Sequence, residues 1–407
     1  MEKYSLIIVG GGAAGLFLAS SAELKNGKIL ILERGERLGR KLSATGNGQG
    51  NLTNEKVGET PYFSFSENGN ARVQEMLSRH GKEEMLAFLE GLGGIFLPDE
   101  RGRFYPAGRQ ASSITDLLRF EVARRGVEVK LGCFVSGVEK RGEVYLVTAQ
   151  TPDGERVFAA NNIAVCTGGK AAKNFGSDGN GYEIVKRFSH TLTPLYPALV
   201  QLKTETKHIK MLKGIRVGGA LVTALVEKTP VASVQGDIIF TDYGVSGDAI
   251  FRISSFIADK IGAQAVSLKI DLLPSVSAEK LASVLESKQR KYPNADRGEL
   301  LCGILNNQVG RAVMKRCLGE PLSAAVACVK AFALPVSGTL GFDYAQVTKG
   351  GVCFDEVDEN LQSKFSRGLY FGGEILDIDG ECGGFNLQWA YTSARVIAES
   401  LKSGGQV

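Results

Sequence analysis

The stretch YSLIIVGGGAAGLFLASSAELKNGKILILERGERLG, residues 4–39, decides the fold of this chain. It reads as an apolar strand, a glycine turn, a helix and a second apolar strand that ends in an acidic residue. Gly10, Gly12 and Gly15 have the G-x-G-x-x-G spacing. The first glycine permits the tight turn, the second lets the backbone approach a pyrophosphate, and the third lets the helix pack closely on the strand. Glu33 ends the second strand, where a carboxylate can accept a hydrogen bond from a ribose hydroxyl. The pattern predicts a Rossmann-type dinucleotide site without separating NAD from FAD.

The loop after the second strand favours FAD. Residues 35–54, GERLGRKLSATGNGQGNLTN, are long and polar, whereas a nicotinamide-only Rossmann unit more often continues into another helix. Such a loop suits a cofactor that extends past its pyrophosphate to a ribitol and a flavin ring. Arg40 and Lys41 are candidates to offset negative charge at the N1–O2 side of a reduced flavin; the alternative is a solvated pair beside the phosphates. Asn51 is either a cofactor contact or a turn cap.

A second helix opens at a glycine turn near the C-terminal end, in DIDGECGGFNLQWA, residues 377–390. Free N–H groups at a helix N-terminus stabilise negative charge. We expect the first helix mouth to take the pyrophosphate and this second one to face the flavin N1–O2 edge. Upstream, a buried strand ends at Thr167-Gly168-Gly169, which suits a close backbone pass by a cofactor. Asp377 or Asp379 is a candidate to hold the ribitol hydroxyls.

Composition places the chain among ordinary globular proteins. Its 407 residues are 43% hydrophobic and 23% charged, enough for two or three domains, and no apolar run approaches membrane-spanning length. Seven scattered cysteines without a CxxC pair favour reduced thiols and a cytoplasmic protein. The histidines, His80, His190 and His208, are too far apart in the sequence to indicate a metal site. Nothing in the sequence indicates the oligomeric state.

The character of the sequence changes in the middle third. From about 191 to 270, short β-like runs separated by turn residues predict an antiparallel sheet or a small barrel. From about 276 to 330, apolar residues recur at helical spacing. We therefore expect a FAD-binding domain formed by residues 1–190 and 346–407, with residues 191–345 as an insertion. The insertion carries 18 Lys and Arg against 13 Asp and Glu, so the excess positive charge of the chain lies within it.

Five strings carry a family resemblance: GGGAAGL (10–16), ERGERLGRKLSATGNGQGNLTN (33–54), FTDYGVSG (240–247), VTKGGV (347–352) and LYFGGEILDIDGECGGFNLQWA (369–390). Through them the chain resembles, over essentially its whole length, the YhiN/BaiN-like flavoprotein family, also labelled the aminoacetone oxidase family of FAD-binding enzymes. The resemblance implies an α/β fold, a Rossmann-like FAD domain of the glutathione-reductase type interrupted by a β-barrel and a helical subdomain.

Motifs and resemblance together give one set of candidate cofactor-binding residues. The set is Gly10, Gly12, Ala14, Gly15, Glu33, Arg34, Arg40, Lys41, Asn51, Thr167, Gly168, Gly373, Glu374, Asp377, Gly384, Phe385 and Asn386.

Two departures from the family pattern concern the proton donor. Many relatives read G-R-C-N in the polar loop, where this chain has Gly48-Gln49-Gly50-Asn51, and many carry His in F-T-H-[YF]-G, where this chain has Asp242. If a relative uses that Cys or His as a proton donor, this chain must use another group. Tyr243, Cys382 and Asp242 are the remaining candidates, and Lys41 is a further catalytic candidate. A helix N-terminus lowers a thiol pKa, but Cys382 is equally explained as a small packing residue.

Three functions stay open. The resemblance implies a FAD-dependent oxidoreductase that moves a hydride equivalent to or from a small amine or conjugated carbonyl. No second G-x-G-x-x-G with its own strand and helix occurs, so NAD(P)H is a candidate only as a transient reductant. The alternatives are a reductase of uridine in ribosomal RNA, which docks through the basic insertion, and a non-catalytic FAD-binding module. The basic residues concerned are Lys203, Lys207, Lys210, Lys213, Arg216, Lys288, Arg290, Lys291, Arg311, Lys315 and Arg316.

Overall fold

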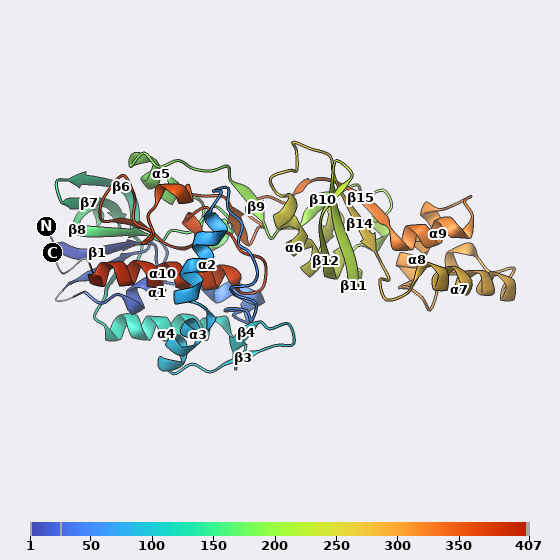
Figure 1. Ribbon diagram of the computed structural model, residues 1–407, viewed down its shortest axis with the longest axis horizontal. Coiled ribbons are helices and arrows are strands. Elements are labelled where there is room, and N and C mark those ends of the chain that lie inside the picture. The colour runs from blue at the N-terminus through green and yellow to red at the C-terminus, as the bar shows by residue number, and fades with distance from the viewer. Residues whose placement is uncertain (1, 25–26, 404–407) are drawn as a thin grey trace. The chain divides into compact units, whose positions relative to one another are not determined.

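Figure 1 shows the computed structural model, which describes residues 2–24 and 27–403. The predicted FAD-binding segments also contain residues 1, 25–26 and 404–407, which lie outside the described residues. The chain divides into two compact units. The first comprises Met1–Tyr196 with Val347–Val407, and the second comprises Pro197–Gln346.

A seven-stranded sheet forms the centre of the first unit. Its order is β5 (Glu128–Lys130), β2 (Ile29–Leu32), β1 (Lys3–Val9), β8 (Gly154–Val165), β7 (Val144–Thr151) and β6 (Phe134–Arg141), with β17 (Leu369–Phe371) also paired to β8. β5, β2, β1, β8 and β17 run parallel, while β6 and β7 are antiparallel. β2, β17, the second half of β1 and the last residues of β8 are apolar and buried, as strands covered on both faces usually are, whereas the edge strand β5 is only partly buried.

The register of the parallel strands assembles the predicted dinucleotide edge. Val9 pairs with Leu32 on one side and with Val165 on the other. The residues that follow these three strands therefore emerge together at the carboxyl ends of the sheet, where open α/β sheets bind ligands.

Helices cover the sheet. They are α1 (Ala13–Ser21), α2 (Gly69–Arg79), α3 (Lys82–Gly91), α4 (Ala111–Arg124), α5 (Gly181–Arg187) and α10 (Phe385–Ser403). α1 is buried on nearly every side because it packs between α10 and α4, and Figure 1 shows α10 lying along α1. A short hairpin, β3 (Phe96–Pro98) and β4 (Phe104–Pro106), precedes α4.

The second unit is a closed barrel. The strand order is β10 (Leu202–Thr204), β13 (Gly244–Ser246), β12 (Thr229–Phe240), β11 (Arg216–Val226), β14 (Val266–Asp271) and β15 (Phe332–Thr339). All of the barrel pairings are antiparallel. The predicted fold class, a Rossmann-type α/β domain with an inserted barrel, is confirmed.

Two features of the second unit differ from the sequence expectation. α6 (Asp248–Ile257) lies within the stretch read as β-rich and packs against β11 and β12. The helical stretch comprises α7 (Ala278–Lys291), α8 (Asn307–Arg316) and α9 (Leu322–Lys330). The sequence analysis assigned no strand after it, whereas in the structure β15 follows and closes the barrel. Barrel closure depends on pairings between distant strands, which local sequence patterns do not reveal.

The unit boundary also differs at one end. Residues 191–196, read as part of the insertion, lie with the first unit, where Thr193 exchanges hydrogen bonds with Gly351. The two connecting segments, β9 (Tyr196–Ala198) and β16 (Val347–Lys349), form a two-stranded sheet. Among residues 2–24 and 27–403, no helix has both the length and the apolar character to cross a membrane.

Candidate functional site

The first helix mouth has the geometry that its three glycines predict. Gly10 has φ +102°, and a Cβ there would lie 2.6 Å from the Cys166 carbonyl oxygen. A Cβ on Gly15 would lie 2.0 Å from the Gly10 carbonyl oxygen, so only glycine lets α1 pack this close to β1. Gly12, by contrast, has nothing within 4 Å of its Cβ position. Its open side is where the predicted pyrophosphate would lie.

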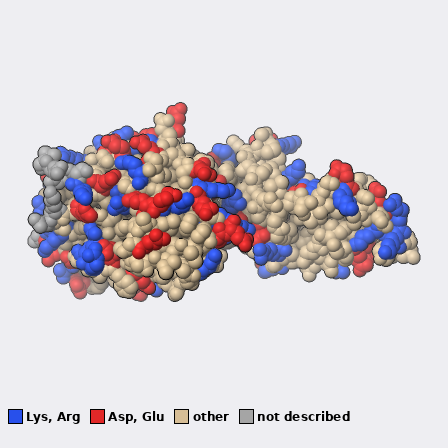
Figure 2. Space-filling view, turned by 60° about the horizontal axis from the view of Figure 1, so that its bottom comes forward, with Lys and Arg blue, Asp and Glu red and all other residues tan. Residues whose placement is uncertain are grey.

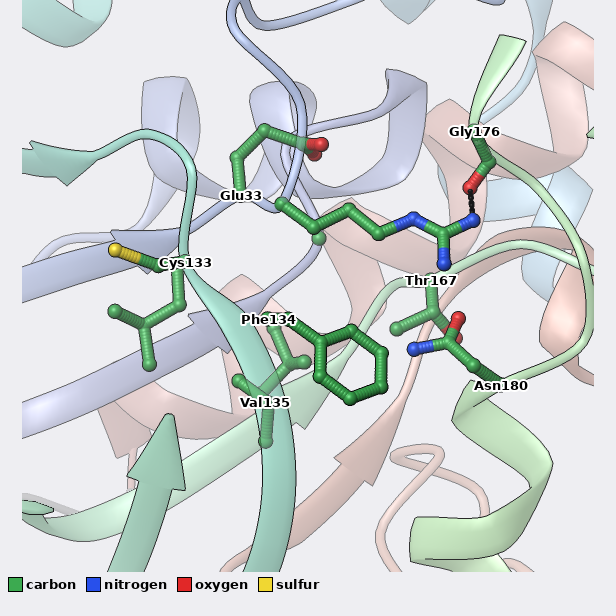
Figure 3. A pocket seen from close by; sticks show the side chains of 11 residues that line it. Glu33, Cys133, Phe134, Val135, Thr167, Gly176 and Asn180 are labelled. Carbon is green, nitrogen blue, oxygen red and sulfur yellow. Dashed lines mark hydrogen bonds between the residues drawn. The ribbon is translucent and has the colours of Figure 1, made fainter. Parts of the chain in front are cut away.

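A small, partly open hollow lies beside this mouth. It is lined by Val9, Gly10, Leu32, Glu33, Arg34, Cys133, Phe134, Val135, Thr167, Gly176 and Asn180. Figure 3 shows the Phe134 ring and the side chains of Glu33, Thr167 and Asn180 around this space. The sequence analysis predicted the β1, β2 and β8 ends of this wall. It missed residues 133–135 and 176–180, because neither stretch carries a recognisable motif.

Glu33 does more than its motif predicts. Its Oε2 accepts a hydrogen bond from the Gly11 N–H at 2.7 Å, and Oε1 accepts from the Gly35 N–H at 2.6 Å. The carboxylate therefore fixes both glycine turns at the edge of the hollow. Each oxygen retains a second lone pair, so a ribose hydroxyl can still donate to it.

Replacing Glu33 by alanine is expected to weaken FAD binding tenfold to about a hundredfold, because a half-buried acceptor and two turn contacts are lost together. Titration of the flavin-free protein with FAD, followed by flavin fluorescence, measures the dissociation constant. The control is Glu36→Ala, whose exposed side chain lies three residues on. Equal affinities for the two variants would remove Glu33 from the site.

Lys41 and Glu374 form an ion pair at 2.7 Å between Nζ and Oε2, with both side chains largely buried. The other Glu374 oxygen accepts from the Thr348 N–H at 2.9 Å. Thr348 Oγ1 in turn accepts from the Lys170 and Ala171 N–H groups. These contacts join the polar loop, the strand-end glycines and the C-terminal segment, which the sequence analysis had treated as separate candidates.

The second helix mouth is also shaped by glycines. A Cβ on Gly373 (φ +76°) would lie 2.9 Å from the Ala14 Cβ, so this turn packs on the first turn of α1. A Cβ on Gly384 (φ +105°) would lie 2.6 Å from Thr53 backbone atoms. The Asn386 side-chain amide exchanges hydrogen bonds with the Gly380 N–H and carbonyl, which closes the loop before α10.

Phe385 begins α10, and its carbonyl accepts a hydrogen bond from the Tyr62 hydroxyl at 2.9 Å.

Asp377 is completely buried. Its Oδ2 accepts from the Phe65 N–H at 2.8 Å and from the Ser64 hydroxyl at 3.2 Å. Burial raises the pKa of this carboxyl to about 6, although these hydrogen bonds act to lower it. Asp377 is therefore a buried acid that titrates near neutral pH, a property common at functional sites.

A buried cation lies against the same segment. Lys349 is 9% exposed, and its Nζ lies 4.8 Å from the Phe63 ring centroid and 5.9 Å from that of Phe65. Aromatic faces stabilise a desolvated ammonium. The string VTKGGV carries part of the family resemblance, but nothing in it predicts the burial of this lysine.

The catalytic candidates fall in both units. Lys41 and Cys382 belong to the first unit, whereas Tyr243 belongs to the barrel unit, between β12 and β13. The Tyr243 carbonyl accepts from the Thr204 N–H at 3.1 Å. Its neighbour Asp242 pairs with Lys213 at 2.6 Å, and this hydrogen bond lowers the pKa of the Asp242 carboxyl. A carboxyl that stays ionised is a poor proton donor, which argues against Asp242 in that role.

One constellation looks catalytic but is structural. Ser363 Oγ lies 2.6 Å from His190 Nε2, and His190 Nδ1 lies 3.2 Å from Glu356 Oε2. Burial lowers the pKa of His190, so its neutral ring can accept from the serine hydroxyl. Ser363 Oγ also accepts from the Phe365 and Ser366 N–H groups, and the His190 side chain is fully buried. The serine is therefore saturated and inaccessible as a nucleophile, and the group anchors the loop that carries it.

The residues present fit FAD. The open side of Gly12 leaves room for a phosphate, while the close contacts of Gly10 and Gly15 hold the helix mouth in place. Three side-chain oxygens of the predicted set, Asn51 Oδ1, Thr167 Oγ1 and Asp377 Oδ1, are buried without a hydrogen-bond partner among the described residues. Buried polar atoms are normally satisfied, and a polar ligand with hydroxyl and amide groups would satisfy these three.

Comparison with known proteins agrees with this geometry. The family model described as HI0933-like protein Rossmann domain matches residues 4–400. A 3-dehydro-bile acid delta(4,6)-reductase of Clostridium scindens is 35% identical over 420 residues, which cover 96% of this chain and 98% of the relative. A ribosomal RNA dihydrouridine synthase of Haemophilus influenzae is 28% identical over 98% of this chain and 99% of the relative.

Two solved structures share the fold across nearly the whole chain. A 3-ketosteroid-delta4-(5alpha)-dehydrogenase from Rhodococcus jostii has a TM-score of 0.53 at 15% identity, with 98% of this chain and 96% of that chain covered. A flavocytochrome c3 fumarate reductase has a TM-score of 0.51 at 14% identity, with 100% and 79% covered. The chain therefore belongs to the HI0933-like Rossmann-domain family and is a FAD-dependent oxidoreductase.

Proposed function

We propose that this protein is a reductase of small molecules that carry a conjugated carbonyl, with NAD(P)H as the transient reductant. The observation that carries the proposal is the 35% identity, over nearly the full length of both chains, to a protein named as a bile acid reductase. The identity to the relatives named for ribosomal RNA is lower, at 28% and 27%.

The chemistry of the site supports a reduction. Bound FAD supplies the hydride equivalent. Reduction of a conjugated double bond also needs a proton, and Asp377 is a buried group that can hold one near neutral pH. Asp377 is thus a better candidate for a proton store than Asp242, whose carboxyl is exposed and ion-paired. The Lys41–Glu374 pair is proposed to hold the polar loop against the strand-end glycines around the cofactor.

The test is an anaerobic half-reaction series on the purified flavoprotein. We expect NADH or NADPH to bleach the visible flavin absorbance, and a steroid with a conjugated ketone to restore it. A saturated ketone of the same skeleton is the control for binding without reduction. Bleaching of the oxidised protein by aminoacetone, with no response to the conjugated ketone, would instead make the protein an amine oxidase.

RNA is the second candidate substrate, and one cluster in the barrel unit favours it. Burial is the largest cause that lowers the pKa of His208. The positive charges of Arg316, Lys207 and Lys315 lower it further, so these three cations lie near the His208 ring. Figure 2 shows Lys and Arg side chains also gathering over the helical end of this unit, where the last turn of α7 is basic.

Other members of the basic set are occupied by contacts within the chain. Lys213 pairs with Asp242, Arg216 pairs with Asp237, and Lys288 donates to the Leu300 and Cys302 carbonyls.

If RNA is the substrate, the affinity of the protein for RNA must fall steeply as the salt concentration rises. On a single strand, the slope of log affinity against log salt concentration is about −0.7 for each phosphate that the protein neutralises. RNA affinity is expected to fall most in a Lys207→Glu, Lys210→Glu, Lys315→Glu triple variant. These three side chains are exposed, and none of them belongs to an ion pair described above, so the substitutions change the surface charge alone. Filter binding of structured ribosomal RNA at several salt concentrations measures the slope. Wild-type protein that binds no RNA at low salt while retaining its flavin would eliminate this candidate.

A further inference from the structure

Three basic side chains of the first unit contact one short segment of backbone. Lys41 Nζ lies 3.4 Å from the Ala171 carbonyl oxygen, and Arg40 Nη2 donates to the Asn174 carbonyl at 2.9 Å. Arg34 Nη2 donates to the Gly176 carbonyl, and its Nη1 pairs with Asp178 Oδ2 at 2.9 Å. Residues 41, 40 and 34 thus contact residues 171, 174 and 176–178 in that order, so the three side chains hold the segment at successive points along its length.

The segment, residues 171–180, is called the strap below. It forms part of the wall of the hollow beside the first helix mouth, through Gly176 and Asn180. Figure 3 shows the Gly176 carbonyl with its hydrogen bond at the rim of this space, opposite Glu33. The strap contains one short 3-10 turn, Lys173–Phe175, and glycines in the left-handed region at 176 and 179. It is thus an irregular segment whose position depends on side-chain contacts.

The contacts of Arg34 decide between two roles. The sequence analysis includes Arg34 among the candidate cofactor-binding residues. In the structure, both of its terminal nitrogens are directed to the strap. Burial alone would raise the pKa of the Asp178 carboxyl, but hydrogen bonds from Arg34 and from the Asn180 N–H hold that pKa below its usual range. Asp178 is therefore ionised, as a partner of Arg34 must be.

We propose that Arg34 and Asp178 are positioning residues that latch the strap over the adenosine half of the FAD site and so control how fast FAD leaves. The proposal rests on the FAD site described above, not on the identity of the substrate. Arg40 is a second, weaker anchor, because it contacts only a neutral carbonyl. Ser177, within the strap, donates from its hydroxyl to the Gly169 carbonyl at 2.8 Å and so also ties the strap to the glycines that follow β8.

The size of the effect follows from the exposure of the pair. The Arg34 and Asp178 side chains are 26% and 29% exposed, so their interaction is partly screened. Loss of a charged hydrogen bond of this kind corresponds to FAD release about fivefold to tenfold faster.

The experiment measures FAD release directly. Holoprotein is mixed with an excess of the flavin-free form of another FAD-binding protein, which captures the FAD that is released. The dissociation rate is followed by flavin fluorescence at low and high salt. The variants are Arg34→Gln, Asp178→Asn and the double variant, and the controls are Arg37→Gln and Asp153→Asn at exposed positions. Thermal unfolding of each flavin-free variant checks that the fold is retained.

The latch predicts that both single variants release FAD faster by similar factors and that the double variant is no faster than either. It also predicts that salt accelerates release from the wild type more than from the variants. Direct binding of a phosphate by Arg34 predicts the opposite for Asp178→Asn, since removal of a negative charge near a phosphate would slow release. Release that is slower or unchanged in Asp178→Asn would overturn the proposal. Because no substrate is present, failure of the proposed reductase activity leaves this result unaffected.

Discussion

Replacing Gly12 by valine is expected to weaken FAD binding by roughly a hundredfold or more while leaving the fold intact. Gly12 caps α1 with φ −78° and ψ −164°, an extended conformation that any residue adopts, and no atom lies within 4 Å of its Cβ position. The folded chain therefore tolerates the side chain. A phosphate at the helix mouth does not, because the valine would occupy the space through which backbone N–H groups reach it.

The loss should be large. Two charge-assisted hydrogen bonds of about 1.5–3 kcal/mol each correspond to a decrease in FAD affinity of roughly a hundredfold or more. The matched comparison is Gly15→Ala, where the added methyl would lie 2.0 Å from the Gly10 carbonyl oxygen. That variant is expected to lose about 2–4 kcal/mol of unfolding free energy, with or without flavin. Calorimetry of flavin-free protein and FAD titration separate the two effects. If Gly12→Val binds FAD normally, the first helix mouth is not the pyrophosphate site.

Replacing Asp377 by asparagine is expected to stabilise the flavin-free protein at pH 8. The folded-state pKa of about 6 lies above the ordinary value of 3.8, so the fold favours the protonated carboxyl. Below the unfolded-state pKa of 3.8, Asp377 does not lower the free energy of unfolding. As the pH rises from 3.8 to the folded-state pKa of about 6, the free energy of unfolding falls, and above that pH the loss stays constant. Two pKa units correspond to about 3 kcal/mol of unfolding free energy at pH 8, which the neutral amide recovers.

The gain should vanish near pH 4, where aspartate is mostly protonated in the fold. Urea unfolding of wild type and variant at both pH values measures the difference. A gain at pH 8 together with weaker FAD binding or slower turnover would mark Asp377 as a group kept at a cost to stability for its role in the site. Equal stabilities at pH 8 would contradict the raised pKa. Asp153→Asn, at an exposed position, is the control for charge removal alone.

The sequence was most informative where chemistry restricts residue type. The spacing of Gly10, Gly12 and Gly15 predicted three different roles, and the structure gives each glycine a different environment. Similarly, the glycine turn before α10 predicted a helix mouth, which begins at Phe385. Positions such as these tolerate few residues, so a single sequence already carries the constraint.

Long-range contacts could not be read in this way. Arg34 and Arg40 stay candidates for the cofactor site, but no pattern in the sequence indicated that both contact the strap, more than 130 residues away. The burial of Lys349 between two phenylalanine rings and the closure of the barrel by β15 likewise depend on distant segments. Periodicity predicts the element in which a residue lies, but the partners of a side chain follow from tertiary packing.

The proton donor was likewise hard to assign from the sequence. Family departures at Asp242 and in the polar loop raised the question, and the sequence left Asp242, Tyr243 and Cys382 as candidates without choosing among them. The candidate that the structure adds, Asp377, was known from its motif as a possible ribitol contact. Its complete burial, which shifts its pKa toward neutrality, is a property of the fold.

The most direct test of the account is one anaerobic measurement on the purified protein. The bound flavin is first identified as FAD by mass after heat release, and the holoprotein is then reduced with NAD(P)H. A steroid with a conjugated ketone is added, and the visible flavin absorbance is recorded. The account predicts FAD, bleaching by the nicotinamide, and return of the absorbance in step with saturation of the conjugated double bond. A protein that contains no FAD, or whose reduced flavin is reoxidised by uridine-containing RNA and not by the conjugated ketone, would contradict it.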